Sequence, residues 1–577
     1  MSGFDFHQPR DALTLPEWSP LARALQRWAL AHGASSTLAM LAGWACQSEA
    51  QGDSVLRLDD PRLPVLDAAT RTALLGEVLC SDGERAAPFV LQGDRFYLWR
   101  NHAAEDAIAT SLLARLRHPA DAGPPPHWLM ELFEGSDPDA SAAQRVAVAA
   151  AAQQRLLLLS GGPGTGKTST VLRILLLLQR LQPTPLTLHL AAPTGKAAQR
   201  LAQALRSGRE ALAARLDQPW QEVLQRLPSP DVQTLHRLLE FDPRRNRFRR
   251  GKEQRLAADV VVIDEASMVD LEQLRALLAA VPEQARLVLV GDPGQLHSVA
   301  AGAVLADIGR VLQTKGCPQW QQLEHVFRAD APLQPLLQAI RAGDLPALHA
   351  AVTAAPTAIA IHDAGSRGAL AALLRRWGDS LRAWQAALPA QVDTPDQAAA
   401  ALRSLAGRQL LCALREGEFG AGRCQRALEQ DLRHSLGAVD SAWFHGRAVM
   451  ILRNDYGYGL FNGDIGLALR DSTGRMQVWF ESGEEGTRAY APATLPAHEG
   501  AFALTIHKSQ GSEYDTVAVL LPPQAEPRFL SRQLLYTGVS RAKSRVELWA
   551  GEGVVRLALH QDAQRASGLG ERLLALS

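Results

Sequence analysis

Continuous apolar runs mark the strands expected in this chain. Residues 155–159, 186–190, 259–263 and 287–290 are rich in Leu and Val, and each run ends in a turn with Gly, Pro or acidic residues. A strand that is apolar on both sides is typical of a parallel sheet covered by helices on both faces. Helical spacing follows the first run at residues 169–180. The pattern therefore predicts an α/β lobe.

The same pattern returns later in the chain and predicts a second α/β lobe. Residues 409–414 and 501–506 again have the pattern of buried strands. Between them, residues 445–495 form short alternating stretches with many glycines, which indicates a small antiparallel β barrel inserted into the second lobe. Residues 323–328 predict one further strand, which ends in an arginine.

These changes of pattern divide the chain into predicted domains. Residues 1–120 form a mainly helical N-terminal domain without a catalytic pattern. Its apolar and Trp side chains either form only a core or also dock another protein. The first lobe is expected at 128–330, the second at 331–577, and the insert at 445–495.

Composition narrows the class of protein. The chain is 47% hydrophobic and 21% charged, and it has no membrane-spanning run or signal peptide, so we expect a globular protein without a membrane partner. Five scattered cysteines argue against disulfides and against zinc or iron–sulfur sites, which fits a cytoplasmic location. The formal net charge is zero, so a nucleic-acid site must be a local groove.

The first predicted strand ends in the strongest motif of the chain, Gly-x-x-x-x-Gly-Lys-Thr. Its glycines let backbone N–H groups surround a phosphate, while Lys167 reaches the terminal phosphates and Thr168 offers its hydroxyl to Mg²⁺. The N-terminus of the next helix adds a favourable dipole. We therefore expect a nucleoside triphosphate here. The expected binding residues are Gly161, Gly162, Pro163, Gly164, Thr165, Gly166, Lys167, Thr168 and Ser169.

Other polar residues lie beside the predicted strands. Asp264 and Glu265 follow the strand at 259–263, where one carboxylate holds Mg²⁺ and the next orients and deprotonates the attacking water. Gln295 follows the next strand and is placed to sense the γ-phosphate. Gln144 precedes the phosphate loop; it is either a reader of the adenine edge or a surface residue of a helix.

Two arginines are candidates for neutralising charge on the γ-phosphate. Arg328 ends a predicted strand, and Arg541 lies near the C-terminus. If the second lobe faces the first across a cleft, both take the arginine-finger role. Taken alone, Arg328 is an ordinary surface residue.

A basic segment at about 241–256 contains seven Arg and Lys residues around Phe248. Such a run is either a solvated face or a hairpin that touches nucleic-acid phosphates. The sequence leaves both readings open.

Taken in order, these motifs resemble the superfamily-1 helicases, and specifically the superfamily-1B RecD family, the alpha subunits of exodeoxyribonuclease V in RecBCD complexes. The resemblance covers the chain from about residue 140 to the C-terminus. It implies two RecA-like lobes with a nucleotide cleft between them and an SH3-like insert at 445–495. The residues that carry it are 161–168, 191–198, 234–239, 262–268, 291–296, 505–513 and 536–542.

The resemblance also implies an activity and partners. Members of this family are bacterial motors that use ATP and Mg²⁺ to move 5′ to 3′ on single-stranded DNA, and they assemble with RecB and RecC at broken duplex ends for recombinational repair. It implies that Glu513 contacts the nucleotide. The short N-terminal domain favours the complex-bound type, in which this region docks on RecC. The implied DNA contacts are Thr194, Lys196, Thr234, His236, Thr505, His507 and Lys508.

Three functions other than a DNA motor can be tested against the sequence. A restriction-like nuclease needs Asp or Glu two positions before Lys, and none of the six lysines has this spacing, so we expect cleavage by a partner subunit. A DNA-stimulated regulatory ATPase that clamps DNA without unwinding it stays open. An RNA helicase also stays open, because recognition of the 2′-hydroxyl leaves no mark in the sequence.

Overall fold

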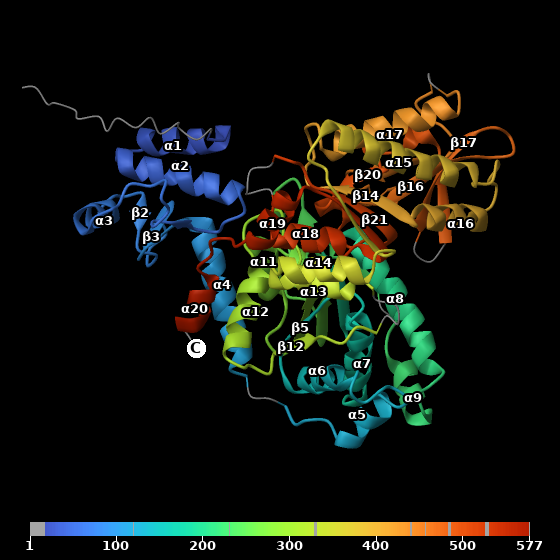
Figure 1. The fold of residues 1–577 in the computed structure, drawn as a ribbon. Helices are drawn as coiled ribbons and strands as arrows, with labels where there is room; N and C mark the ends of the chain where they lie inside the picture. The colour runs from blue at the N-terminus through green and yellow to red at the C-terminus, as the bar shows by residue number, and fades with distance from the viewer. Residues whose placement is uncertain are drawn as a thin grey trace, which may run out of the picture.

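The computed structural model describes residues 18–118, 121–229, 231–327, 332–438, 441–455, 457–482, 486–524 and 530–575. An N-terminal domain is followed by a first lobe and then by a second lobe that carries a β insert (Figure 1). Within these described ranges, no helix is long and apolar enough to cross a membrane. The α/β class expected from the sequence is confirmed.

Six parallel strands form the sheet of the first lobe, in the order β12-β5-β11-β10-β6-β7. The four predicted runs form β5, β6, β10 and β11, because their Leu and Val side chains are buried by helices on both faces. The strands are β5 (Leu156–Gly161), β6 (Leu188–Ala192), β7 (Val232–Thr234), β10 (Val260–Ile263), β11 (Arg286–Gly291) and β12 (Trp320–Leu323).

The strand expected at 323–328 is wrong in its position. β12 ends at Leu323, which is its last buried side chain. Residues 324–327 have no regular secondary structure, and Glu324 and His325 are exposed. The chain therefore leaves the sheet before it reaches Phe327.

Helices cover both faces of this sheet and build two cores. One core contains α4 (Trp99–Leu116), α11 (Leu271–Ala280) and α12 (Val304–Thr314). The other contains α5 (Pro126–Leu132), α6 (Ala142–Gln153), α7 (Lys167–Arg180), α8 (Gly195–Ala213) and α9 (Gln218–Arg226). The short helix α10 (Leu235–Leu238) follows β7. Because α4 shares the first core, it packs with the first lobe although it lies within residues 1–120, which were expected to form the N-terminal domain.

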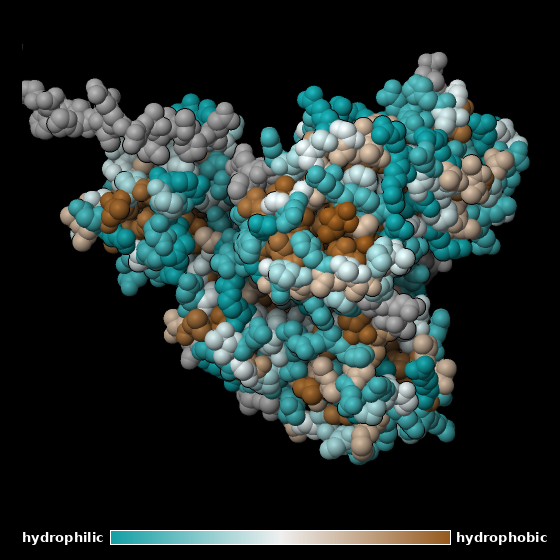
Figure 2. Space-filling model, viewed as in Figure 1, coloured by the Kyte–Doolittle hydropathy of each residue, from teal (hydrophilic) through white to brown (hydrophobic). Residues whose placement is uncertain are grey.

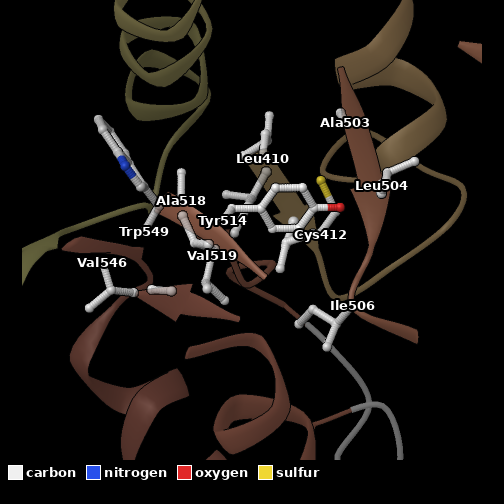
Figure 3. Packing of buried hydrophobic residues seen from close by; sticks show 14 of the residues in the cluster. Leu410, Cys412, Ala503, Leu504, Ile506, Tyr514, Ala518, Val519, Val546 and Trp549 are labelled. Carbon is white, nitrogen blue, oxygen red and sulfur yellow. The ribbon is translucent and has the colours of Figure 1, made fainter. Parts of the chain in front are cut away.

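The second lobe has a five-stranded parallel sheet in the order β13-β22-β21-β14-β20. Figure 3 shows Leu410, Val519 and Leu504 from three of these strands packed in one core. The strands are β13 (Ile359–His362), β14 (Arg408–Cys412), β20 (Ala503–Thr505), β21 (Tyr514–Leu520) and β22 (Ala542–Trp549). The helices are α13 (Gln334–Ala342), α14 (Leu345–Ala354), α15 (Arg367–Ala386), α16 (Pro395–Leu405), α17 (Ala421–Ser435), α18 (Arg532–Val539) and α19 (Glu552–His560).

The insert is an antiparallel sheet of five strands in the order β18-β17-β16-β15-β19. It has its own small core, in which the Phe480 ring fills the space that a side chain at Gly466 would need. Closure of this sheet into an SH3-like barrel stays a prediction. The strands are β15 (Arg447–Ile451), β16 (Ile465–Arg470), β17 (Met476–Ser482), β18 (Gly486–Tyr490) and β19 (His498–Gly500).

The N-terminal domain combines helices with a small sheet, in the order β1-β4-β3-β2. Its helices are α1 (Pro20–Ala31), α2 (Ser36–Ala50) and α3 (Ala68–Leu75). The strands are β1 (Leu56–Arg57), β2 (Cys80–Ser81), β3 (Phe89–Gln92) and β4 (Arg95–Leu98). Val65 and Val78 are 95% and 83% exposed. Figure 2 shows hydrophobic residues, coloured brown, among the hydrophilic residues on the surface of this domain.

The C-terminal segment returns from the second lobe to the N-terminal part of the chain. Arg565 donates hydrogen bonds to the carbonyls of Ser298, Ala300 and Gly302 in the first lobe. Helix α20 (Leu569–Ala575) then packs against α4 and α12. The carboxylate of Glu105 on α4 anchors this segment.

Glu105 is fully buried and accepts hydrogen bonds from three sides. Ser54 Oγ donates to it at 2.6 Å, Gly568 N at 3.1 Å and Arg572 Nε at 3.4 Å. Removal of a buried carboxylate costs free energy, because its charged and neutral donors stay buried without a hydrogen-bond acceptor. The last helix is therefore held by one buried ionic contact.

We predict that Glu105→Ala releases α20. Loss of a buried partner costs about 3 kcal/mol, so amide hydrogens of residues 569–575 exchange at least about tenfold faster, measured by hydrogen-exchange mass spectrometry. Glu571→Ala is the matched control on α20 itself, since its pair with Arg95 is half exposed. Unchanged exchange in Glu105→Ala would contradict the anchor.

Candidate functional site: a nucleotide cleft between two lobes

The phosphate loop connects the end of β5 to the start of α7. Gly164 and Gly166 have φ angles of 76° and 79°, a backbone region that residues with a Cβ rarely adopt. Lys167 Nζ donates to the carbonyls of Gly161 at 2.7 Å and Gly162 at 2.9 Å. Thr165 Oγ1 also donates to Gly162 O, at 2.9 Å. The loop therefore holds a defined curve, with the lysine ammonium inside it.

Gln144 lies directly against this loop. It is buried on α6, and its Nε2 donates to Thr165 O at 3.3 Å. The same amide lies so close to Gly166 that a side chain there would collide with it. Gln144 is therefore a buried residue and not a surface residue of its helix, while its contact with an adenine edge stays a prediction.

Asp264 and Glu265 follow β10 directly, where parallel strands present their carboxyl ends. Glu265 has a φ of 50°, a left-handed conformation that costs about 1 kcal/mol for a residue with a side chain. Its backbone N–H donates to Asp264 Oδ1 at 2.9 Å. The strained turn thus points the two carboxylates into one small region.

The pKa of Asp264 is raised from 3.8 to about 6. Burial is the main cause and the neighbouring charge of Glu265 is the second, while the ammonium of Lys167 acts in the opposite direction. A divalent cation between Asp264 and the phosphates would relieve this repulsion. The carboxylate pair and the adjacent Thr168 hydroxyl therefore suit a hard cation such as Mg²⁺.

Gln295 and Arg541 meet across the two lobes. Gln295 follows β11 in the first lobe and Arg541 follows α18 in the second, and both are at least 96% buried. Arg541 Nη2 donates to Gln295 Oε1 at 3.1 Å. The same guanidinium donates to Thr537 O and Ser512 O. The predicted sensor and the predicted arginine finger are therefore neighbours.

A cleft of about 400 Å³ brings these residues together. Glu513 lines it from the second lobe and forms a 3.0 Å ion pair with Arg200 on α8. Arg328 lies outside the described residues. The predicted residues that line the cleft are Pro163, Gly164, Thr165, Gly166, Lys167, Thr168, Ser169, Asp264, Glu265, Gln295, Glu513 and Arg541.

Sequence reasoning missed Phe327 and Arg200. Phe327 is 45% exposed, lines the cleft, and donates its backbone N–H to Gly164 O at 3.0 Å. A partly exposed ring beside a phosphate loop suits stacking on a nucleotide base. Its position directly before Arg328 was the available signal. No signal in the sequence marks Arg200, because its ion pair with Glu513 forms only where the second lobe approaches α8.

The residues implied for DNA contact occupy the ends of their strands but already have partners. Thr194 accepts from Ala197 N and caps α8, and Thr234 accepts from Arg237 N and caps α10. Thr505 ends β20 and accepts from Lys508 N at 3.4 Å. A hydroxyl that accepts a capping bond can still donate its proton to a phosphate.

The remaining implied DNA contacts differ in their surroundings. Lys508 forms a 2.5 Å ion pair with Glu499 in the insert. Lys196 lies 6.0 Å from the ring centre of Tyr514, between the two lobes. His507 is exposed on the second lobe. These residues lie on three different parts of the fold, so their common role stays a prediction.

Comparisons with known proteins agree with this geometry. Residues 144–301 match an AAA domain and residues 500–548 match a UvrD-like helicase C-terminal domain. The RecBCD enzyme subunit RecD of Mycolicibacterium smegmatis is 39% identical over 84% of this chain and 83% of its own length. RecD of Haemophilus influenzae is 30% identical, over 89% and 85%. The chain belongs to the RecD family.

The resemblance expected from the motifs is thereby confirmed. An ATP-dependent RecD2 DNA helicase of Deinococcus radiodurans is 30% identical over 67% of this chain and 46% of its own length. The two helicase domains and these relatives place the RecD-family chain among the ATP-dependent DNA helicases.

The basic segment of this RecD-family chain forms a hairpin of β8 (Phe241–Asp242) and β9 (Arg247–Phe248). Its two Phe rings pack against each other and against His236, with ring centres 5.1 to 5.7 Å apart. Arg249 and Arg250 pair with acidic residues of the hairpin, whereas Arg244 and Arg245 in the turn are exposed. Only part of the basic run therefore faces solvent as free positive charge.

We predict that Asp264→Asn stabilises the Mg²⁺-free protein at pH 7.5. Because the folded-state pKa is raised from 3.8 to about 6, the wild type loses stability as pH rises through this interval, and the loss is complete above pH 6. The amide removes that loss and still accepts the Glu265 N–H. Thermal melting should show a midpoint about 2–5 °C higher.

The gain should shrink as pH falls from 6 toward 4. Asp59→Asn is the control, because a hydrogen bond from Arg57 lowers the pKa of the Asp59 carboxyl. Removal of the Asp59 charge should therefore not raise the thermal midpoint. A gain of equal size at pH 7.5 and pH 4.5 would show that the carboxylate charge is not its source.

Proposed function

We propose that this chain is the ATP-driven motor subunit of a RecBCD-type helicase-nuclease and moves 5′ to 3′ along single-stranded DNA. One observation carries the proposal: Arg541 of the second lobe donates a hydrogen bond to Gln295 of the first, beside the phosphate loop. A nucleotide in this cleft would therefore contact residues of both lobes. Hydrolysis can then be coupled to their relative movement.

The cleft residues fit ATP and Mg²⁺. The phosphate loop and Lys167 would hold the phosphates, and Thr168 and Asp264 would hold Mg²⁺, which supplies charge neutralisation to the phosphates. Glu265 would take the proton of the attacking water, and Gln295 would orient that water. Arg541, with Arg328 as a second candidate, would neutralise charge as the γ-phosphate leaves. Gln144 and Phe327 would contact the base.

The DNA strand is proposed to cross the carboxyl ends of both sheets. Thr194, Thr234 and Thr505 all lie at or just beyond such ends, so their hydroxyls are placed to donate to phosphates. Lys196, His236, His507 and Lys508 would contribute further contacts. Because the formal net charge is zero, we expect the DNA affinity to depend on this local groove.

The names of the relatives, which are RecBCD subunits, support a proposal about the partners. We propose a heterotrimer with RecB and RecC at duplex ends, in the bacterial cytoplasm, with DNA cleavage carried out by a partner. The exposed apolar side chains of the N-terminal domain, such as Val65 and Val78, support docking on RecC. The insert would adopt the SH3-like barrel of the family.

The first test is unwinding by the purified chain on duplexes with either a 5′ or a 3′ single-stranded tail, with ATP and Mg²⁺. We expect opening of the 5′-tailed duplex alone. Lys167→Gln should abolish both ATP hydrolysis and unwinding, because the terminal phosphates lose their ammonium. Lys315→Gln changes the C-cap residue of α12, which is not among the described residues that line the cleft, so it serves as the control and should behave as the wild type.

Other outcomes are informative. Opening of only the 3′-tailed duplex would contradict the direction. ATP hydrolysis that DNA stimulates, without unwinding of either duplex, would favour the regulatory clamp. Adding RecB and RecC then separates a clamp from a motor that works only in the complex.

A further inference from the structure

Asp292 is a deeply buried charged group near the nucleotide cleft. It follows β11, three residues before Gln295, and its side chain is 1% exposed. A buried carboxylate needs compensating donors, and its position decides where these donors must lie. Among the residues that the structure describes, its side-chain donors outside its own loop come from the second lobe.

Arg341 and Tyr536 are these donors. Arg341 on α13 donates from Nη2 to Asp292 Oδ1 at 2.6 Å, and Tyr536 on α18 donates from its hydroxyl to Oδ2 at 2.9 Å. Arg341 also lies over the Tyr536 ring, 4.8 Å from its centre. Burial, and then the Asp292 charge, raise the pKa of Tyr536 well above 10, so its hydroxyl remains a donor.

Arg341 reaches the phosphate loop as well. A Cβ atom on Gly162 would lie 3.7 Å from its guanidinium, and one on Gly294 would lie 3.2 Å from its Nε. Only at Gly294 would the added atom be closer to Arg341 than ordinary van der Waals contact. The Arg341 side chain therefore lies beside the phosphate loop and closely beside the loop after β11, from a helix of the second lobe.

Asp292 also forms hydrogen bonds with Gln295, so it connects Arg341 to the predicted sensor. The backbone N–H of Gln295 donates to Asp292 O at 3.0 Å, and its Nε2 lies 3.4 Å from Asp292 Oδ2. With Nε2 turned toward Asp292, the Gln295 amide presents Oε1 to Arg541. The orientation of the predicted sensor is thus set on one side by Arg541 and on the other by the Asp292 group.

We propose that Arg341, paired with Asp292 and Tyr536, is a positioning residue for ATP hydrolysis that orients Gln295. The inference rests on the proposed function and adds a residue to its site. Arg341 acts through the carboxylate and not on the phosphates. Its loss therefore slows the chemical step and leaves nucleotide binding nearly unchanged.

The test compares Arg341→Ala, Arg341→Lys and Tyr536→Phe in the full chain, assembled with its partners if the isolated chain is inactive. We expect Arg341→Ala to lower kcat for DNA-stimulated ATP hydrolysis about 10- to 100-fold, with KM for ATP within about threefold. Arg341→Lys should recover much of kcat, because an ammonium still pairs with Asp292. Tyr536→Phe should fall between the wild type and Arg341→Ala.

Two controls separate positioning from a loss of fold. Arg310→Ala removes an exposed arginine of α12 that lines a cavity together with Arg341 but is not among the donors to Asp292, and it should keep the wild-type kcat. Arg341→Ala leaves the buried Asp292 carboxylate without its cation and should lower the thermal midpoint, because a buried charge without its partner destabilises the fold. Arg341→Lys and Tyr536→Phe each keep a donor on Asp292, so they test the inference if Arg341→Ala does not fold.

A double variant gives the decisive result. In single turnover, Arg341→Ala combined with Gln295→Ala should hydrolyse ATP no more slowly than Gln295→Ala alone, because one residue acts through the other. Fully additive losses, or a wild-type kcat in Arg341→Ala, would overturn the inference. A wild-type chain that hydrolyses ATP without unwinding DNA, both alone and with RecB and RecC, would overturn the proposed motor instead, while this comparison of hydrolysis rates would still hold.

Discussion

The contact between the two lobes depends on the hydrogen-bond partners of the buried polar groups in the loop after β11. This loop buries a carboxylate, an amide and backbone groups at the boundary of the lobes, and buried polar groups need partners. Their partners come from the second lobe: Arg341 and Tyr536 for Asp292, Arg541 for Gln295, and Thr537 Oγ1 for Leu296 N. Separation of the lobes would leave these groups without their donors. The nucleotide site is therefore complete only while the lobes are in contact.

Much of the fold could be predicted because its strands are buried on both faces. Runs such as Leu156–Leu159 and Val260–Ile263 need no long-range information, since continuous Leu and Val between turn residues have few other stable arrangements. The phosphate loop and the carboxylate pair were predictable for a related reason. Their chemistry demands particular residues at a fixed spacing directly after a strand, so Lys167, Asp264 and Glu265 lie where the motifs indicate.

What the sequence did not reveal depends on contacts between distant segments. Arg341 lies on an ordinary amphipathic helix, and only the approach of α13 to Asp292, 49 positions earlier, distinguishes it from other surface arginines. The strands β1 and β2 of the N-terminal domain were missed because strands of two residues carry too little periodicity. The strand expected at 323–328 failed because the pattern could not show that burial ends at Leu323.

The return of the C-terminal segment has a mechanical consequence. The lobes are joined once by the chain that follows β12, and a second time by the segment that carries Arg565 and α20 back to the first lobe and the N-terminal domain. Two connections between the same two lobes limit how far the lobes can separate while both connections stay in place. Opening of the nucleotide cleft must therefore keep Arg565 and α20 on the first lobe, or it must detach them.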